Sequence, residues 1–282
     1  MAEETISCPI ITFFSTASSV GKTLVSTNSA AELAREGYSV CLVDFDLQFG
    51  DVCNYLQLMP ENTVADVQQG MASEGADCQI QDYLTVYEHE NVQFEVMAAP
   101  LKLEEAYNIK TSPMKIMLQQ LQKMFDYIVV DTTSMFSELN LAVLDMSTVV
   151  IFLGIRDFFP TIKNMSIGNE TLKNLHYDQN KLRIVLNRGD SQSDIPMELV
   201  TKTLGEDFYY ILPNDFRVAN HSIKSGVPLV LEQENNRLSD ALRELVSQST
   251  NQEYRPEDGP METYHHENSG GGFLSRLFGG KE

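Results

Sequence analysis

The chain has 282 residues, 43% of them hydrophobic, and carries a formal charge of −20 from 40 acidic and 20 basic residues. It is long enough to bury one sizeable core, and it contains no apolar run of about 18 residues that could form a transmembrane helix. The acidic balance would repel phosphate backbones over most of the surface, which argues against non-specific DNA binding.

The N-terminal segment, residues 1–4 (MAEE), is acidic and leads directly into an apolar stretch. It lacks the basic start, the apolar run and the small-residue cleavage site of a secretory signal, so we expect a cytoplasmic protein. The four cysteines form no C-x-x-C pair, and no histidine follows them at zinc-ligand spacing. We therefore expect reduced thiols, with neither disulfides nor a structural metal.

Short apolar runs alternate along the chain with segments of helical length. Nearly continuous apolar strands are typical of a sheet that is buried on both faces, and the helices between them favour right-handed crossovers. The sequence therefore predicts an α/β fold with a doubly wound, mostly parallel sheet and helices on both faces. The predicted strands are residues 9–14, 39–44, 93–99, 127–131, 147–154 and 182–187, and predicted helices include residues 23–35, 113–124 and 160–176.

The turn between the first strand and the first helix reads "SSVGKT". Backbone N–H groups at such a turn, a helix N-terminus, a lysine and a hydroxyl are the groups that bind phosphates and Mg²⁺. The usual pattern places glycine five residues before Gly21, where Thr16 stands, but the strand-to-helix context favours a nucleotide site over a chance G-K-T. The predicted phosphate-binding residues are Ser18, Ser19, Val20, Gly21, Lys22, Thr23 and Leu24.

Three carboxylates follow apolar strands. Asp44 and Asp46 end the second strand, and Asp131 ends the strand "YIVVD". The carboxyl ends of parallel strands gather around ligands, and a carboxylate that ends a buried strand needs a partner such as Mg²⁺. The alternative for Asp44 and Asp46 is that they are solvated turn residues that cap the next segment.

Residues 9–230 resemble the MinD/ParA superfamily of deviant Walker A ATPases, most closely its CpaE/TadZ branch, whose members help to localise and assemble pili. The resemblance implies a P-loop NTPase fold with ATP and Mg²⁺ as cofactors. It depends on seven stretches in the expected order: "SSVGKTLVSTNSAAELAREGYSVCLVDFDLQFGDV", "VMAAPLKLEEA", "FDYIVVDTT", "IRDFFPTIKN", "LNRGD", "ILPND" and "SIKSGVPLV".

The resemblance also implies roles for single residues. Lys22 and the loop amides would hold the phosphates, Thr23 would ligate Mg²⁺, and Asp131 would support the metal. Asp46 would position the attacking water, and Asp44 would order the waters of Mg²⁺. The adenine would be bound by Asn187 and the residues near it, a set that comprises Asn187, Arg188, Pro213, Asn214 and Asp215. Family members close two subunits around ATP, so an ATP-dependent homodimer is the implied state.

The chain departs from the superfamily at two places. The signature K-G-G-x-G-K-T begins with a lysine that reaches the partner subunit's phosphates, and Ala17 takes that position here. Loss of a cation donated in trans lowers the rate of phosphoryl transfer more than it lowers binding. We therefore keep two expectations, a slow ATPase and an ATP-binding dimeric scaffold with negligible hydrolysis. In addition, Ser134 and its neighbours replace the proline or glycine that commonly follows the strand ending in Asp131.

The chain is expected to divide into an ATPase domain (1–248), an acidic linker (249–271) and a short tail (272–282). In the tail, Phe273, Leu274, Leu277 and Phe278 share one helical face and Arg276 takes the other. The tail resembles the membrane-targeting tail of MinD-type proteins, and such a helix would lie in a lipid interface. The alternatives are a tail that folds back onto the domain and a peptide that binds a protein.

The expected location is therefore peripheral, at the inner face of the cytoplasmic membrane. The expected partners are a second copy of the chain, the membrane surface, and proteins of a pilus, secretion or division machinery. A MinD-type regulator of the division site or of flagellar number is the alternative. A chromosome or plasmid partition protein would need to bind DNA, against which the charge of −20 argues.

Overall fold

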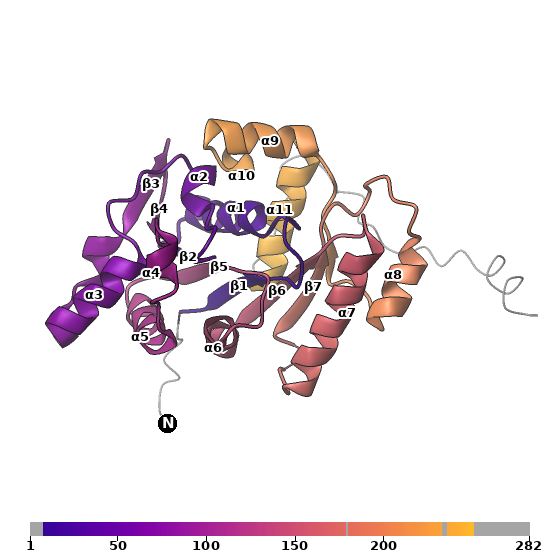
Figure 1. Cartoon of the computed structure of the whole chain (residues 1–282). Coiled ribbons are helices and arrows are strands. Elements are labelled where there is room, and N and C mark those ends of the chain that lie inside the picture. Colours follow the sequence, from indigo (N-terminus) through magenta and orange to yellow (C-terminus); the bar gives the residue numbers. More distant parts are fainter. Residues whose placement is uncertain (1–7, 179, 233–235, 251–282) are drawn as a thin grey trace, which may run out of the picture.

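The computed structural model describes residues 8–178, 180–232 and 236–250 (Figure 1). An eight-stranded sheet forms its centre, with the order β3-β4-β2-β5-β1-β6-β7-β8. All neighbouring strands are parallel except β3 and β4. The strands are β1 Ile10–Phe14, β2 Val40–Phe45, β3 Thr85–His89, β4 Val92–Met97, β5 Tyr127–Thr132, β6 Val149–Gly154, β7 Leu182–Leu186 and β8 Tyr210–Ile211.

Helices cover both faces of this sheet. Apolar side chains of α1, α2, α10 and α11 share one core cluster with the strands, and those of α3, α5, α6, α7 and α8 lie in clusters on the other face. The helices are α1 Lys22–Arg35, α2 Val52–Tyr55, α3 Val64–Glu74, α4 Leu103–Ala106, α5 Thr111–Leu121, α6 Glu138–Met146, α7 Phe159–Asn174, α8 Met197–Leu204, α9 Phe216–Ser225, α10 Leu229–Glu232 and α11 Arg237–Thr250.

The central strands have no polar face because both of their faces are buried. In β1, Ile11 and Phe13 pack in the cluster of α1 and α11, whereas Ile10 and Phe14 pack on the opposite side. Every residue of β1, β2 and β6 is buried. This burial explains why the strands read as continuous apolar runs, and the predicted doubly wound, mostly parallel sheet is confirmed.

The six predicted strands are present with small shifts at their ends, and the structure adds two strands at the edges of the sheet. β3 is antiparallel and only its central residue, Tyr87, is buried, while β8 has two residues. Neither forms the continuous apolar run that identified the other strands. The predicted helix at 23–35 corresponds to α1, which is followed by Gly37 in the left-handed conformation (φ 93°).

The strand register places Asp44 and Asp131 together at the carboxyl ends of two neighbouring strands. Asp44 in β2 lies beside Asp131 in β5, and Asp131 lies beside Phe13 in β1. The loop that follows β1 therefore begins beside Asp131, and Asp44 lies one strand further away. None of the described helices has the length and hydropathy needed to cross a membrane. The expected tail, residues 272–282, lies outside the described residues.

Candidate nucleotide-binding site

The loop between β1 and α1 has two residues with positive φ, Ser19 (59°) and Gly21 (98°). A Cβ atom on Gly21 would lie 2.4 Å from the Asn187 side-chain nitrogen, so both the conformation and the space require glycine here. No side chain caps the N-terminus of α1 at Gly21. Among the described residues, no side chain is hydrogen-bonded to the first N–H groups of α1, at the end of the helix that attracts anions.

Lys22 is the first residue of α1, and its side chain reaches the segment that follows β5. Its ammonium Nζ donates a hydrogen bond to Ser134 Oγ at 2.9 Å, and that hydroxyl donates to the carbonyl of Ala17 at 2.8 Å. Only 8% of Lys22 is exposed. The loop, the lysine and the segment after β5 are therefore linked directly.

Thr23 and Asp131 form the second link between α1 and β5. Thr23 Oγ1 donates to Asp131 Oδ2 at 2.6 Å, while the buried Asp131 Oδ1 has no hydrogen-bond partner among the described residues. Burial raises the pKa of Asp131 to about 7, against the lowering effects of the Thr23 hydrogen bond and the Lys22 charge. A buried, half-satisfied carboxylate of this kind has the capacity to accept a further donor or a cation.

Asp44 lies beside Asp131 and is held by backbone N–H groups. Its Oδ1 accepts from the Asp46 N–H at 3.0 Å, and its Oδ2 accepts from the Val52 N–H at 3.2 Å. A Cβ on Gly50 would lie 2.5 Å from Asp44 Oδ2, so glycine lets this loop close over the carboxylate. Burial, followed by repulsion from Asp131, raises the pKa of Asp44 well above its ordinary value. Burial also raises the pKa of Asp46, which the Lys22 charge opposes.

Asn187, at the end of β7, contacts the loop from the other side. Its Nδ2 donates to the carbonyl of Val20 at 2.8 Å, and its Oδ1 accepts from the N–H of Arg188 at 2.9 Å. Arg188 has a positive φ of 56° and donates from Nη2 to the carbonyl of Ser19 at 3.4 Å. Its Nη1 lies 3.8 Å from Asp157 Oδ2. Both residues thus brace the phosphate loop in this structure.

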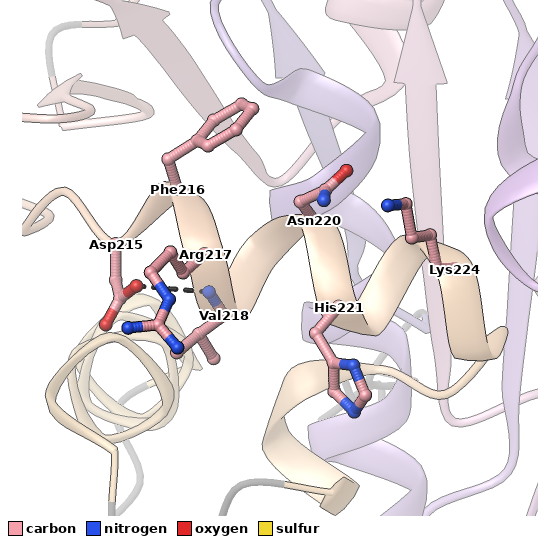
Figure 2. Close-up of a pocket in the computed structure, with 7 residues that line it drawn as sticks. All are labelled: Asp215, Phe216, Arg217, Val218, Asn220, His221 and Lys224. Atoms are coloured by element: carbon pink, nitrogen blue, oxygen red, sulfur yellow. Dashed lines mark hydrogen bonds between the residues drawn. The ribbon is translucent and has the colours of Figure 1, made fainter.

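The segment 213–215 precedes α9. Pro213 is buried, the N–H of Asn214 donates to Asp190 Oδ1 at 2.6 Å, and Asp215 caps α9 by accepting from the Val218 N–H at 3.1 Å. Figure 2 shows an open hollow along α9 that begins at this cap; its lining comprises Asp215, Phe216, Arg217, Val218, Asn220, His221 and Lys224. Since the whole lining comes from one helix and its cap, it is an open surface feature distinct from the buried carboxylates.

Sequence reasoning recognised that residues 132–134 depart from the superfamily pattern but did not connect Ser134 with Lys22. It also missed Gly50, although a glycine soon after Asp44 and Asp46 was a visible signal. Among the described residues, no group of three or more His, Cys, Asp or Glu side chains forms a ready metal site. A Mg²⁺ site here would need ligands from a bound phosphate, as is usual for this ion.

A strand, a tight phosphate-type loop and a helix at the centre of a doubly wound parallel sheet define the P-loop nucleotide-binding class of proteins. The chain belongs to the CobQ/CobB/MinD/ParA nucleotide-binding domain family, whose model matches residues 11–229. The predicted membership in the MinD/ParA superfamily is therefore confirmed.

Known proteins agree with this assignment. The septum site-determining protein MinD of Thermotoga maritima is 25% identical over 239 residues, which cover 80% of this chain and 82% of the relative. A ParA family ATPase from Chlorobium tepidum has a similar structure, with a TM-score of 0.76 and 20% identity over 85% of this chain and 99% of that one. MinD from Pyrococcus horikoshii, solved with Mg-ADP, gives a TM-score of 0.71 and 20% identity over 85% and 95%. The structural likenesses support the fold.

Proposed function

We propose that this protein is an ATP- and Mg²⁺-dependent ATPase of the MinD/ParA type that dimerises around nucleotide and positions a machinery at the membrane. A pilus assembly or secretion machinery is the cargo that the resemblance to the CpaE/TadZ branch favours. The observation that carries the proposal is the Asp131 carboxylate, which is 1% exposed, hydrogen-bonded to Thr23 through one oxygen and, in the part of the chain that the structure describes, without a partner at the other.

The residues at this position suit Mg²⁺. The Thr23 hydroxyl and the carboxylates of Asp44 and Asp131 are hard oxygen donors, which this ion prefers, and the unpartnered Asp131 oxygen would gain a partner through the ion or one of its waters. When bound with nucleotide, Mg²⁺ would supply positive charge to the phosphate oxygens during transfer. The buried carboxylates would in turn lose their mutual repulsion.

Side chains and backbone groups of the chain would bind the phosphates and the base and orient the attacking water. Lys22 and the N–H groups at the start of α1 would bind phosphate oxygens, and the half-buried Asp46 would orient the attacking water. Asn187 and Arg188 would lie beside the base, together with residues 213–215. Because Asn187 already holds the Val20 carbonyl, its role toward adenine would come in addition to bracing the loop.

Exposed apolar side chains support a face-to-face dimer. Five large ones, each between 64% and 73% exposed, lie in the loops or helix starts that follow β2, β4, β5, β6 and β8: Phe49, Leu101, Met135, Phe158 and Phe216. The carboxyl ends of these strands also carry the predicted nucleotide site. Covering such side chains with a second copy of the chain would remove apolar surface from water.

Membrane attachment is proposed from the sequence of the tail. Eleven residues with a narrow apolar face would bind lipid weakly and reversibly, and two tails on one dimer would raise the effective concentration of the second. Nucleotide would thereby control residence at the inner face of the cytoplasmic membrane. A MinD-type regulator of the division site or of flagellar number would use the same arrangement.

Nucleotide binding and phosphate release test the proposal. The wild-type chain is expected to bind ATP with Mg²⁺ and release phosphate slowly. Lys22→Ala should weaken binding by about 100-fold or more, because it removes the cation of the phosphate loop. Asp46→Ala should bind ATP but release phosphate more slowly. Absence of nucleotide binding by the wild-type chain would refute the proposal.

A second candidate function is an ATP-binding dimeric scaffold with negligible hydrolysis. Ala17 favours it, because the cation that the superfamily donates in trans from this position is missing. The same assay separates the two functions. Wild-type phosphate release no faster than that of Asp46→Ala, with ATP binding intact, would establish the scaffold.

The membrane step needs its own experiment. Vesicles of phosphatidylethanolamine and phosphatidylglycerol are sedimented with the full chain in ATP or ADP, and with a chain ending at Ser269. We expect the full chain to sediment most with ATP and the shortened chain to stay in solution. Equal sedimentation in all three cases would contradict the proposed role of the tail while leaving nucleotide binding untouched.

A further inference from the structure

The Ser134 hydroxyl contacts the phosphate loop at two places, Ala17 before Gly21 and Lys22 directly after it. Its hydroxyl accepts from the Lys22 ammonium at 2.9 Å and donates to the carbonyl of Ala17 at 2.8 Å. A hydroxyl has one proton, and the Ala17 carbonyl takes it. The lone pairs of Ser134 Oγ are therefore directed away from that bond and are available to Lys22.

The ammonium of Lys22 depends on this contact. Lys22 is 8% exposed, and within the described ranges no carboxylate lies within ion-pair distance of its nitrogen and no other residue accepts a hydrogen bond from it. An ammonium group has three donors. With one donated to Ser134, the others remain for an incoming anion, and the buried charge has a fixed neighbour in the meantime.

The segment around Ser134 is hydrogen-bonded to α6. Asn140, which is 1% exposed, donates from Nδ2 to the carbonyls of Thr133 at 3.1 Å and Met135 at 2.7 Å. These bonds fix the backbone on both sides of Ser134. The backbone that carries the serine hydroxyl is therefore held by α6 on both sides.

We propose that Ser134 is a positioning residue that holds Lys22 ready for the phosphates of a bound nucleotide. Lysine has a long flexible stem whose ordering costs conformational entropy, so a side chain already fixed in the site binds an anion at lower cost. This inference depends on the proposed function, because it concerns the same site. It gives Ser134, which departs from the superfamily pattern, a role in positioning Lys22.

The experiment compares Ser134→Ala, Ser134→Thr and Ser137→Ala in the full chain. Fluorescent analogues of ATP and ADP are titrated in the presence of Mg²⁺. We expect Ser134→Ala to weaken the binding of both nucleotides about tenfold, the size expected for a lost hydrogen bond to a charged group. Ser134→Thr keeps the hydroxyl and should bind within about threefold of the wild type.

Ser137→Ala is the matched control. Ser137 caps α6 in the same segment by accepting from the Asn140 N–H at 3.2 Å, but it does not contact Lys22. A loss of affinity that came only from loosening this segment would appear in both alanine variants, whereas loss of positioning would appear in Ser134→Ala alone. Binding by Ser134→Ala equal to the wild type, or tighter, would overturn the inference.

A second readout separates this inference from the proposed function. If the wild-type chain binds neither nucleotide, the proposed function fails, and hydrogen exchange of the amides in residues 16–23 of the nucleotide-free protein then decides. Faster exchange in Ser134→Ala than in the wild type and Ser137→Ala would support the anchoring of the loop by Ser134. Unchanged exchange would overturn it.

Discussion

The two ends of strands β2 and β5 use the same chemical group in opposite ways. At the start of β5, the exposed Asp126 accepts from the N–H and the hydroxyl of Ser39, which precedes β2, and these bonds lower its pKa. At the other end of the two strands, Asp44 and Asp131 lie side by side and buried, and burial raises the pKa of both carboxyl groups.

This difference separates stability from function. Asp126 is exposed to solvent and hydrogen-bonded to Ser39, so its charge stabilises the fold where the two strands begin. Asp44 and Asp131 are held close together, and no cationic side chain of the described residues forms an ion pair with either, an arrangement that costs free energy unless a ligand relieves it. At the carboxyl ends of β2 and β5, the carboxylates are therefore placed to bind a ligand. At the amino ends, the Asp126 carboxylate stabilises the fold.

Among the changes that test this comparison, the largest effect is expected in the loop that leads into α1. Gly21→Ala should weaken nucleotide binding by about 100-fold and destabilise the fold by about 2–4 kcal/mol, because alanine is strained at φ 98° and its Cβ would meet Asn187. Fluorescent nucleotide titration and chemical denaturation measure the two effects. Adding Asn187→Ala relieves the clash but not the strain at φ 98°, and it also removes the Asn187–Val20 hydrogen bond, so the double variant should recover only in part. Full recovery in the double variant would contradict a requirement for positive φ.

An intermediate effect is expected at the buried end. Asp131→Asn keeps the shape and the acceptor for Thr23 but removes the charge, so Mg²⁺ should enhance nucleotide binding about 10- to 100-fold less than in the wild type. The Mg²⁺-free protein should be no less stable, since a buried, half-satisfied charge is removed. Calorimetry with and without Mg²⁺ measures both. An unchanged Mg²⁺ effect would show that Asp131 does not support the metal.

The smallest effect is expected at the exposed end, where Asp126→Asn is the matched carboxylate-to-amide change. Because the folded-state pKa of Asp126 is lowered, its contribution to stability is complete above its ordinary value of 3.8 and is lost as the pH falls through the lowered value. We expect a loss of up to about 1 kcal/mol at pH 7 that disappears in acid, with unchanged nucleotide binding. Urea unfolding at several pH values measures it. A loss that persisted in acid would exclude the charge as its cause.

Much of the architecture could be predicted because it depends on local patterns. The six apolar runs identified the six principal strands, and the strand-loop-helix context of Lys22 and Thr23 indicated a phosphate site. β3 and β8 were not predicted because neither forms an apolar run. β3 has a single buried residue, and β8 is only two residues long. The roles of Asp46, the adenine-side residues and the tail remain predictions.

The sequence by itself determined which chemical groups follow the strands: a glycine, a lysine and a hydroxyl after β1, and carboxylates at the ends of β2 and β5. Only the tertiary structure decided which of them meet. Lys22 and Ser134 are 112 residues apart, and Asn187 and Val20 are 167 apart. In the strand order β2-β5-β1-β6-β7, the first pair follows the neighbouring strands β1 and β5, and the second follows β1 and β7, which β6 separates. That order follows from the packing of helices on both faces, which depends on the whole core and on no single local pattern.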